Sequence, residues 1–213
     1  MDVAIAGGHG QVALRVLRVL AERGDRARGL IRNPDHRGDL EDAGAEPVVA
    51  DFEAGDDIAA AVAGADAVVF AAGAGPGSGP ERKKTVDLGG AVKLIDAAKA
   101  NGIRRYVIVS SMGADDPASA TGSMAPYLQA KAAADEALTT SGLDYTIIRP
   151  GMLTNDPGTG RIEAAQRLGR RGRISRDDVA ATLVAALDEP STVGKSFELL
   201  GGEEEIAAAL RKL

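Results

Sequence analysis

Short apolar runs alternate along this chain with longer stretches in which apolar residues recur every three or four positions. The short runs have the length of buried strands, and the longer stretches have the spacing of amphipathic helices. Strands are predicted at residues 3–6, 27–31, 46–50, 65–71, 106–109, 145–148 and 196–200. Helices are predicted from the first glycine turn to Gly24, at 58–62, through Leu88, Val92 and Ile95 to Asn101, and at about 126–140, 179–187 and 203–213.

This alternation predicts an α/β protein with a doubly wound parallel sheet and helices on both faces. No linker or repeat divides the sequence, so residues 1–213 are expected to form a single Rossmann-type domain. The segment from Gly151 to Ser175 allows only a very small insertion on the substrate side, and the Gly/Pro-rich segment from Gly73 to Pro80 is expected to be a loop.

Ligands of such sheets bind beyond the carboxyl ends of the strands. Most residues at those ends are small or polar here, as a cofactor groove requires. The residues at the predicted strand ends are Gly7, Arg32, Asp51, Phe52, Ala71, Ala72, Gly73, Ser110, Ser111, Pro150 and Gly151.

Residues 7–13, which follow the first predicted strand directly, carry the most specific pattern. They fit both G-x-G-x-x-A and G-x-x-G-x-x-A. Glycines permit a tight turn and a close approach of the backbone to a pyrophosphate, whose charge is favoured at a helix N-terminus. A glycine-rich turn without a ligand is the alternative. The predicted cofactor contacts in this turn are Gly7, Gly8, His9, Gly10, Gln11 and Val12.

Arg32 ends the second predicted strand, where an NAD enzyme carries an acidic residue that binds the ribose 2′-hydroxyl. An arginine suits the 2′-phosphate of NADP instead, and Leu30 and Ile31 offer no carboxylate. We therefore predict NADP as the cofactor; an ordinary surface arginine is the alternative.

Tyr127 and Lys131 are four positions apart on one predicted helix, so their side chains share a face. A tyrosine hydroxyl serves in acid–base catalysis near neutral pH when a positive charge stabilises its phenolate. Ser110 and Ser111 follow the fifth strand and can hydrogen-bond the same substrate oxygen. The alternatives are a solvated helix face for the pair and turn capping for the serines.

Composition limits the function further. The net charge of −6 argues against nucleic acid as a partner, and no apolar run is long enough to span a membrane. The chain has no cysteine and only two histidines, so no metal site is predicted. The first strand begins without a leader segment, and we expect a cytoplasmic monomer or homodimer.

Five motifs together resemble the short-chain dehydrogenase/reductase superfamily. The chain is most similar to the atypical NAD(P)-binding branch, near the NmrA-like and flavin/biliverdin-reductase-like proteins. The motifs, in family order, are the glycine turn, Arg32-Asn33-Pro34, Val109-Ser110-Ser111, Tyr127-x-x-x-Lys131 and Ile148-Arg149-Pro150-Gly151.

The resemblance implies that Tyr127 donates or accepts the proton, and that Lys131 supports its ionisation and holds the nicotinamide ribose. Ser111 would orient the substrate carbonyl, with Ser110 as the second choice. The catalytic asparagine of the family corresponds to Asp87, which is a departure because a carboxylate cannot donate as an amide does.

The sequence therefore predicts an NADP(H)-dependent oxidoreductase acting on a small carbonyl, quinone or flavin-like acceptor. A non-catalytic NADP(H)-sensing regulatory protein is one alternative. An NAD(P)-dependent epimerase or dehydratase, which would use the same residues, is another; the short insertion after Gly151 argues against a large sugar nucleotide as substrate.

Overall fold

The computed structural model describes residues 1–75 and 77–213; position 76, in the expected loop, lies outside them. Nine strands of the described chain form one sheet in the order β11-β8-β10-β6-β5-β4-β1-β2-β3. These strands are β1 (Asp2–Ala6), β2 (Arg26–Ile31), β3 (Glu46–Val49), β4 (Ala67–Phe70), β5 (Arg105–Val109), β6 (Asp144–Pro150), β8 (Arg161–Ala165), β10 (Lys195–Gly201) and β11 (Glu204–Glu205). A separate parallel pair consists of β7 (Met152–Thr154) and β9 (Arg173–Ser175).

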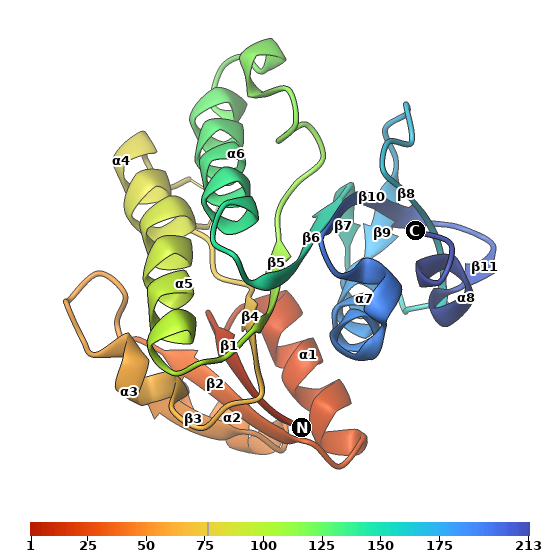
Figure 1. Ribbon diagram of the computed structural model, residues 1–213. Helices are drawn as coiled ribbons and strands as arrows, with labels where there is room; N and C mark the ends of the chain where they lie inside the picture. The colour runs from red at the N-terminus through yellow and green to blue at the C-terminus, as the bar shows by residue number, and fades with distance from the viewer. Residues whose placement is uncertain (76) are drawn as a thin grey trace.

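The helices cover both faces of the sheet (Figure 1). They are α1 (Gln11–Glu22), α2 (Arg37–Asp42), α3 (Ile58–Val62), α4 (Pro80–Arg82), the π-helix η2 (Lys83–Gly90), α5 (Ala91–Ala100), α6 (Met124–Thr139), α7 (Arg176–Asp188) and α8 (Ile206–Leu210). Short 3₁₀ turns are η1 (Pro34–His36), η3 (Pro117–Ser119) and η4 (Pro190–Thr192). Within the described residues, none of the helices is both long and apolar enough to cross a membrane.

Two apolar cores lie on opposite faces of the sheet. On one face α1, α7 and α8 contribute to a core that includes Val3 and Ile5 of β1. On the other face α3, α5 and α6 pack over Phe70 of β4 and Ile108 of β5. Alternate residues of the central strands therefore point into different cores, and the predicted α/β fold class is confirmed.

The order of strands reverses direction between β1 and β4. From β3 through β1 and β4 to β10, every neighbouring pair is parallel. The carboxyl ends of β1 and β4 consequently diverge into connections on opposite sides of the sheet. A crevice at this switch point is the expected ligand site of the fold.

The C-terminal edge departs from the purely parallel alternation that the sequence predicts. Strand β8 pairs antiparallel with β10, and β11 pairs antiparallel with β8. The segment 152–175, for which no element was predicted, supplies β7, β8 and β9. The predicted helix at 203–213 is also shorter, because β11 takes its first residues and α8 begins at Ile206. Pairing with β10 decides the conformation of β8, which has no strong strand pattern of its own.

The long helix after β4 is interrupted rather than regular. Residues Lys83–Gly90 form a π-helix between α4 and α5, with Asp87 and Gly90 as its buried residues. A Cβ added at Gly90 would lie 3.3 Å from the Phe70 ring, so the glycine lets the helix pack closely on the sheet. Such π segments are rare and occur frequently at functional sites.

Candidate active site

The turn from β1 to α1 brings backbone very close to neighbouring strands. Gly7 has φ +78°, and a Cβ there would lie 2.6 Å from Ala72 Cα. A Cβ at Gly8 would lie 2.8 Å from Gly29 Cα. Glycine is therefore required at both positions.

The start of α1 is open to an anion. Gly10 precedes the helix, and within the described residues no side chain caps this end and no acidic residue occupies its first turn. The first backbone N–H groups and the positive end of the helix dipole remain available. This glycine cradle at an uncapped helix N-terminus fits a dinucleotide pyrophosphate.

Two adjoining cavities lie along the carboxyl ends of the strands. The smaller, of about 310 Å³, contains Arg32 and Asp51 and is called here the adenosine-side cavity. The larger, of about 840 Å³, contains Tyr127 and Lys131 and is called here the catalytic-side cavity. Gly10 and residues 71–74 line both, so the two form a continuous cleft over the switch point.

The structure brings nearly all of the residues expected at the site to this cleft. The adenosine-side cavity is lined by Gly7, His9, Gly10, Arg32, Asp51, Phe52, Ala71, Ala72 and Gly73. The catalytic-side cavity adds Gln11, Val12, Asp87, Ser110, Ser111, Tyr127, Lys131, Pro150 and Gly151. Gly8 does not line either cavity; it packs against β2, and its N–H donates to the Leu30 carbonyl at 2.9 Å.

Lys131 is buried at the floor of the catalytic-side cavity, where it joins three elements. Its Nζ donates to the Val109 carbonyl at 3.1 Å and lies 3.2 Å from Asp87 Oδ1. The other Asp87 oxygen accepts a bond from the Ala74 N–H at 3.0 Å. Only 5% of the Lys131 side chain and 1% of the Asp87 side chain are exposed. The pair therefore connects α6 and the π-helix to the last residue of β5 and to the segment that follows β4.

Tyr127 lies one turn of α6 before Lys131 and lines the same cavity. Lys131 Nζ is 5.9 Å from the centroid of the half-buried Tyr127 ring. The positive charge is thus near the phenol without being bonded to its hydroxyl.

The two serines after β5 have different surroundings. Ser110 is buried and its Oγ donates to Asp135 Oδ2 at 2.9 Å. Ser111 is partly exposed and its Oγ donates at 3.2 Å to the adjacent Met112 carbonyl, a weak local bond. Because Ser110 already serves a buried carboxylate, Ser111 is the serine available to a ligand.

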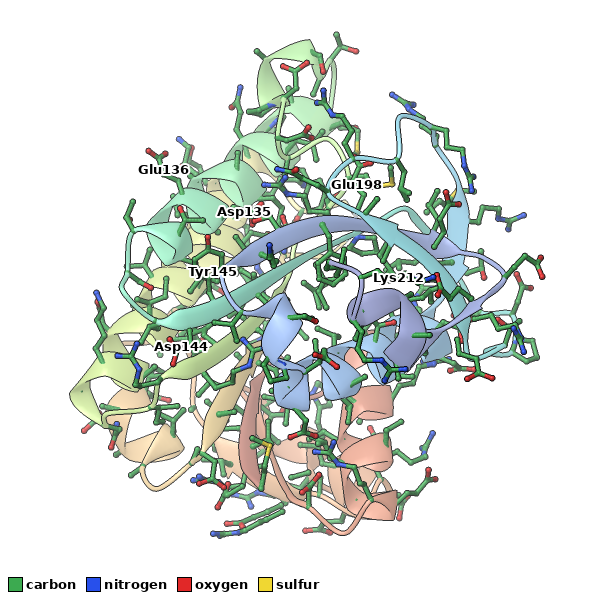
Figure 2. The ribbon with its side chains drawn as sticks, turned by 45° about the vertical axis from the view of Figure 1, so that its right-hand side comes forward. Asp135, Glu136, Asp144, Tyr145, Glu198 and Lys212 are labelled. Carbon is green, nitrogen blue, oxygen red and sulfur yellow. The ribbon has the colours of Figure 1, made fainter. Side chains whose placement is uncertain are left out.

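Asp135 is a buried residue of α6 that connects Ser110 to Arg149. Arg149 Nη2 lies 2.9 Å from the same carboxylate oxygen that accepts from Ser110. Burial raises the pKa of Asp135, while Arg149 and the Ser110 hydrogen bond oppose that rise. Figure 2 shows Asp135 turned inward from α6 and its neighbour Glu136 turned outward.

The adenosine-side cavity contains charged residues that the sequence motifs did not indicate. Glu53 lies between Arg32 and Arg82, which approach its Oε2 at 3.5 and 3.4 Å. The His9 ring stacks on His36 with centroids 3.6 Å apart, and His9 Nε2 is 2.7 Å from Asp39. The rule that ligands lie at strand ends could have singled out Glu53, because it follows β3 closely, but not Arg82, which is the last residue of α4. Nothing in the sequence spacing joins them to Arg32.

Comparison with known proteins agrees with this geometry. A family model described as NAD(P)H-binding matches residues 7–190. A Bacillus subtilis protein named "uncharacterized sugar epimerase YhfK" is 44% identical over 215 residues, covering all of both chains. A solved structure named "putative NAD-dependent epimerase/dehydratase from Bacillus halodurans" superposes with a TM-score of 0.95 at 40% identity over all of both chains. The oxidoreductase ylbE from Lactococcus lactis gives a TM-score of 0.85 at 28% identity, over 100% of this chain and 96% of that one.

Proposed function

The chain belongs to the NAD(P)H-binding family, and we propose that it is an NADP(H)-dependent oxidoreductase that reduces a small carbonyl, quinone or flavin-like acceptor. The observation that carries this proposal is the catalytic-side cavity. It gathers Ser111, Tyr127 and Lys131 beside the open N-terminus of α1, next to the cavity that contains Arg32.

The cleft offers a contact for each part of the cofactor. The N-terminus of α1 would hold the pyrophosphate, and Arg32 would pair with the 2′-phosphate. Lys131, which contacts Val109 and Asp87, would donate to the nicotinamide ribose. When bound, the reduced cofactor supplies a hydride, and the protein supplies orientation and the proton.

Tyr127 is the proton donor in this proposal. Its hydroxyl gives a proton to the substrate oxygen while Lys131 stabilises the resulting phenolate. Ser111 Oγ hydrogen-bonds the same oxygen and fixes its position. Asp87 holds Lys131 in place, and its Oδ2 accepts a hydrogen bond from the Ala74 N–H. A carboxylate has no N–H group, so Asp87 cannot donate as the asparagine amide would.

Tyr127→Phe tests the role of the hydroxyl because it keeps the ring. The rate of NADPH oxidation with the best acceptor from a panel of quinones, flavins and aldehydes should fall by about 10²–10⁴-fold. The affinity for NADPH, measured by calorimetry, should stay within about twofold, because the hydroxyl acts on the substrate rather than on the cofactor.

Tyr145→Phe is the matched control: Tyr145 is a half-buried tyrosine on β6 that does not line either cavity. It should keep the parent rate. If Tyr127→Phe also stays within a few-fold of the parent, the proton comes from another source and Tyr127 is not the acid.

An epimerase or dehydratase is the second candidate, and the names of two similar proteins favour it. Such an enzyme restores its cofactor in every cycle. It would be purified with tightly held oxidised cofactor and would cause no net loss of NADPH with any acceptor. A non-catalytic sensor would bind NADPH without turnover, and Tyr127→Phe would leave its binding unchanged.

A further inference from the structure

A cluster of three charged residues lies in the adenosine-side cavity. Arg32 follows β2, Glu53 is in the loop after β3, and Arg82 is the last residue of α4. Glu53 Oε2 is 3.5 Å from Arg32 Nη1 and 3.4 Å from Arg82 Nη2. A single carboxylate oxygen therefore lies between two guanidinium groups that come from separate parts of the chain.

The Glu53 carboxylate and the loop that carries it each have a further hydrogen bond. Its Oε1 accepts a bond from Thr85 Oγ1 at 2.7 Å, on the first part of the π-helix. The Glu53 backbone N–H donates to Asp51 Oδ1 at 2.8 Å, which fixes the loop that carries it. The carboxylate is thus a fixed anion of the cavity and not a freely rotating surface group.

Two arginines converging on one anionic oxygen form the arrangement that proteins use for phosphate. The planar guanidinium group binds phosphate and carboxylate oxygens with the same hydrogen-bond geometry. An anion that already occupies the arginines opposes a second anion, both by competing for the donors and by charge repulsion. A ribose hydroxyl, in contrast, can donate a hydrogen bond to a carboxylate.

We propose that, in the free protein, the Glu53 carboxylate occupies the position that the 2′-phosphate takes when NADP binds. Arg82 and Arg32 together then bind that phosphate. A 2′-phosphorylated adenosine must displace Glu53 to reach both arginines, whereas an adenosine with a free 2′-hydroxyl keeps Glu53 as its acceptor. Glu53 thereby reduces the preference for NADP over NAD that Arg32 creates. This inference rests on the proposed function in that the cavity must bind the adenosine half of the cofactor.

The test uses two fragments that carry no nicotinamide, so that it does not depend on turnover. Binding of 2′,5′-ADP and of 5′-AMP is measured by calorimetry at low salt for the parent, Glu53→Gln and Arg82→Ala. Since exposed ion pairs contribute modestly, Glu53→Gln should bind 2′,5′-ADP about three- to fivefold more tightly and 5′-AMP no more tightly than the parent. Arg82→Ala should weaken 2′,5′-ADP by about fivefold and leave 5′-AMP within about twofold.

Glu81→Gln is the matched control, because it removes the same charge one residue from Arg82. Glu81 is exposed and pairs with Lys84 at 3.2 Å instead of with the cluster. It should leave both fragments at the parent affinity. Equal tightening by Glu81→Gln and Glu53→Gln would show an effect of net charge alone and would overturn the proposal.

The failures of the two proposals are distinguishable. A parent protein that binds neither fragment overturns the cofactor assignment, and this inference with it. A parent that binds both fragments, with no change in selectivity in Glu53→Gln or Arg82→Ala, overturns only the roles given to these two residues. Thermal unfolding of each variant establishes that a loss of binding is not a loss of the fold.

Discussion

Lys131 and Asp87, at one end of the cleft, are almost completely buried, whereas at the other end the Arg32, Arg82 and Glu53 side chains are 55%, 39% and 31% exposed. Both ends contain carboxylates paired with cations. Removing one partner of a buried pair leaves an uncompensated charge away from water, but an exposed charge is readily solvated. The Lys131 end is therefore tied to the stability of the fold, whereas substitutions at the Arg32 end should change binding at little structural cost.

Asp87→Ala should have the largest effect on the fold. It leaves the Lys131 ammonium buried without its carboxylate and the Ala74 N–H without an acceptor. The free energy of unfolding, measured with urea, should fall by about 3–5 kcal/mol. Asp87→Asn keeps the side-chain volume and an acceptor oxygen for Ala74, so the free energy of unfolding should fall less in this variant. If both variants have the free energy of unfolding of the parent, the buried Lys131–Asp87 pair does not stabilise the fold.

Arg32→Ala should act on selectivity and not on stability. The affinity for NADPH should fall by about tenfold, which is about 1.4 kcal/mol, because a charged hydrogen bond to the 2′-phosphate is lost. The free energy of unfolding should change by less than about 0.5 kcal/mol, as for other exposed positions. Calorimetry with NADPH and NADH tests the first expectation, and equal affinity of the parent for the two cofactors would contradict the role of Arg32.

Asp135→Asn should produce the smallest change, a difference in how stability depends on pH. Burial raises the pKa of Asp135 above its ordinary value of 3.8, so the folded state holds this proton to a higher pH than the unfolded chain does. Through that window the folded state binds more protons, and the contribution of Asp135 to the free energy of unfolding falls as the pH rises. The advantage of the parent over Asp135→Asn should therefore shrink as the pH rises from 4 upward.

Urea unfolding of both proteins at several pH values measures this difference. An advantage of the parent that grows with pH would mean that Arg149 holds the pKa of Asp135 below its ordinary value. Asp96→Asn, an exposed change on α5, serves as the control and should give a nearly constant difference.

The parts of the site that the sequence predicts are those encoded by short spacing. The turn at Gly7 and Gly10 follows a strand directly, and Tyr127 and Lys131 are one helical turn apart, so local geometry suffices to bring each pair together. Ser111 could be placed at a strand end but not distinguished from Ser110 by sequence. That distinction depends on Asp135, which is 25 positions from Ser110 in the chain.

Features that depend on distant partners could not be predicted. Glu53 meets Arg82 only because the β3 and β4 connections converge over the switch point. Strand β8 gains its conformation from antiparallel pairing with β10, and its own sequence has only Ile162 fully buried. The fold class can be predicted from the periodicity of apolar residues. An edge strand such as β8 or an ion pair such as Glu53–Arg82 depends on contacts between distant residues, which no local sequence pattern indicates.

The π-helix also fixes the length of the chain between β4 and α5. A π-helix closes its backbone hydrogen bonds from residue i to residue i+5, so each of its turns takes one residue more than a turn of α5. The angle between Asp87 and Gly90 around the helix axis therefore differs from the angle that an α-helix would give. Asp87 reaches Lys131 and Gly90 lies on Phe70 at that π-helical angle. A variant that lacks one residue in this segment can close it as a regular α-helix, and the directions of these two contacts relative to each other would then change.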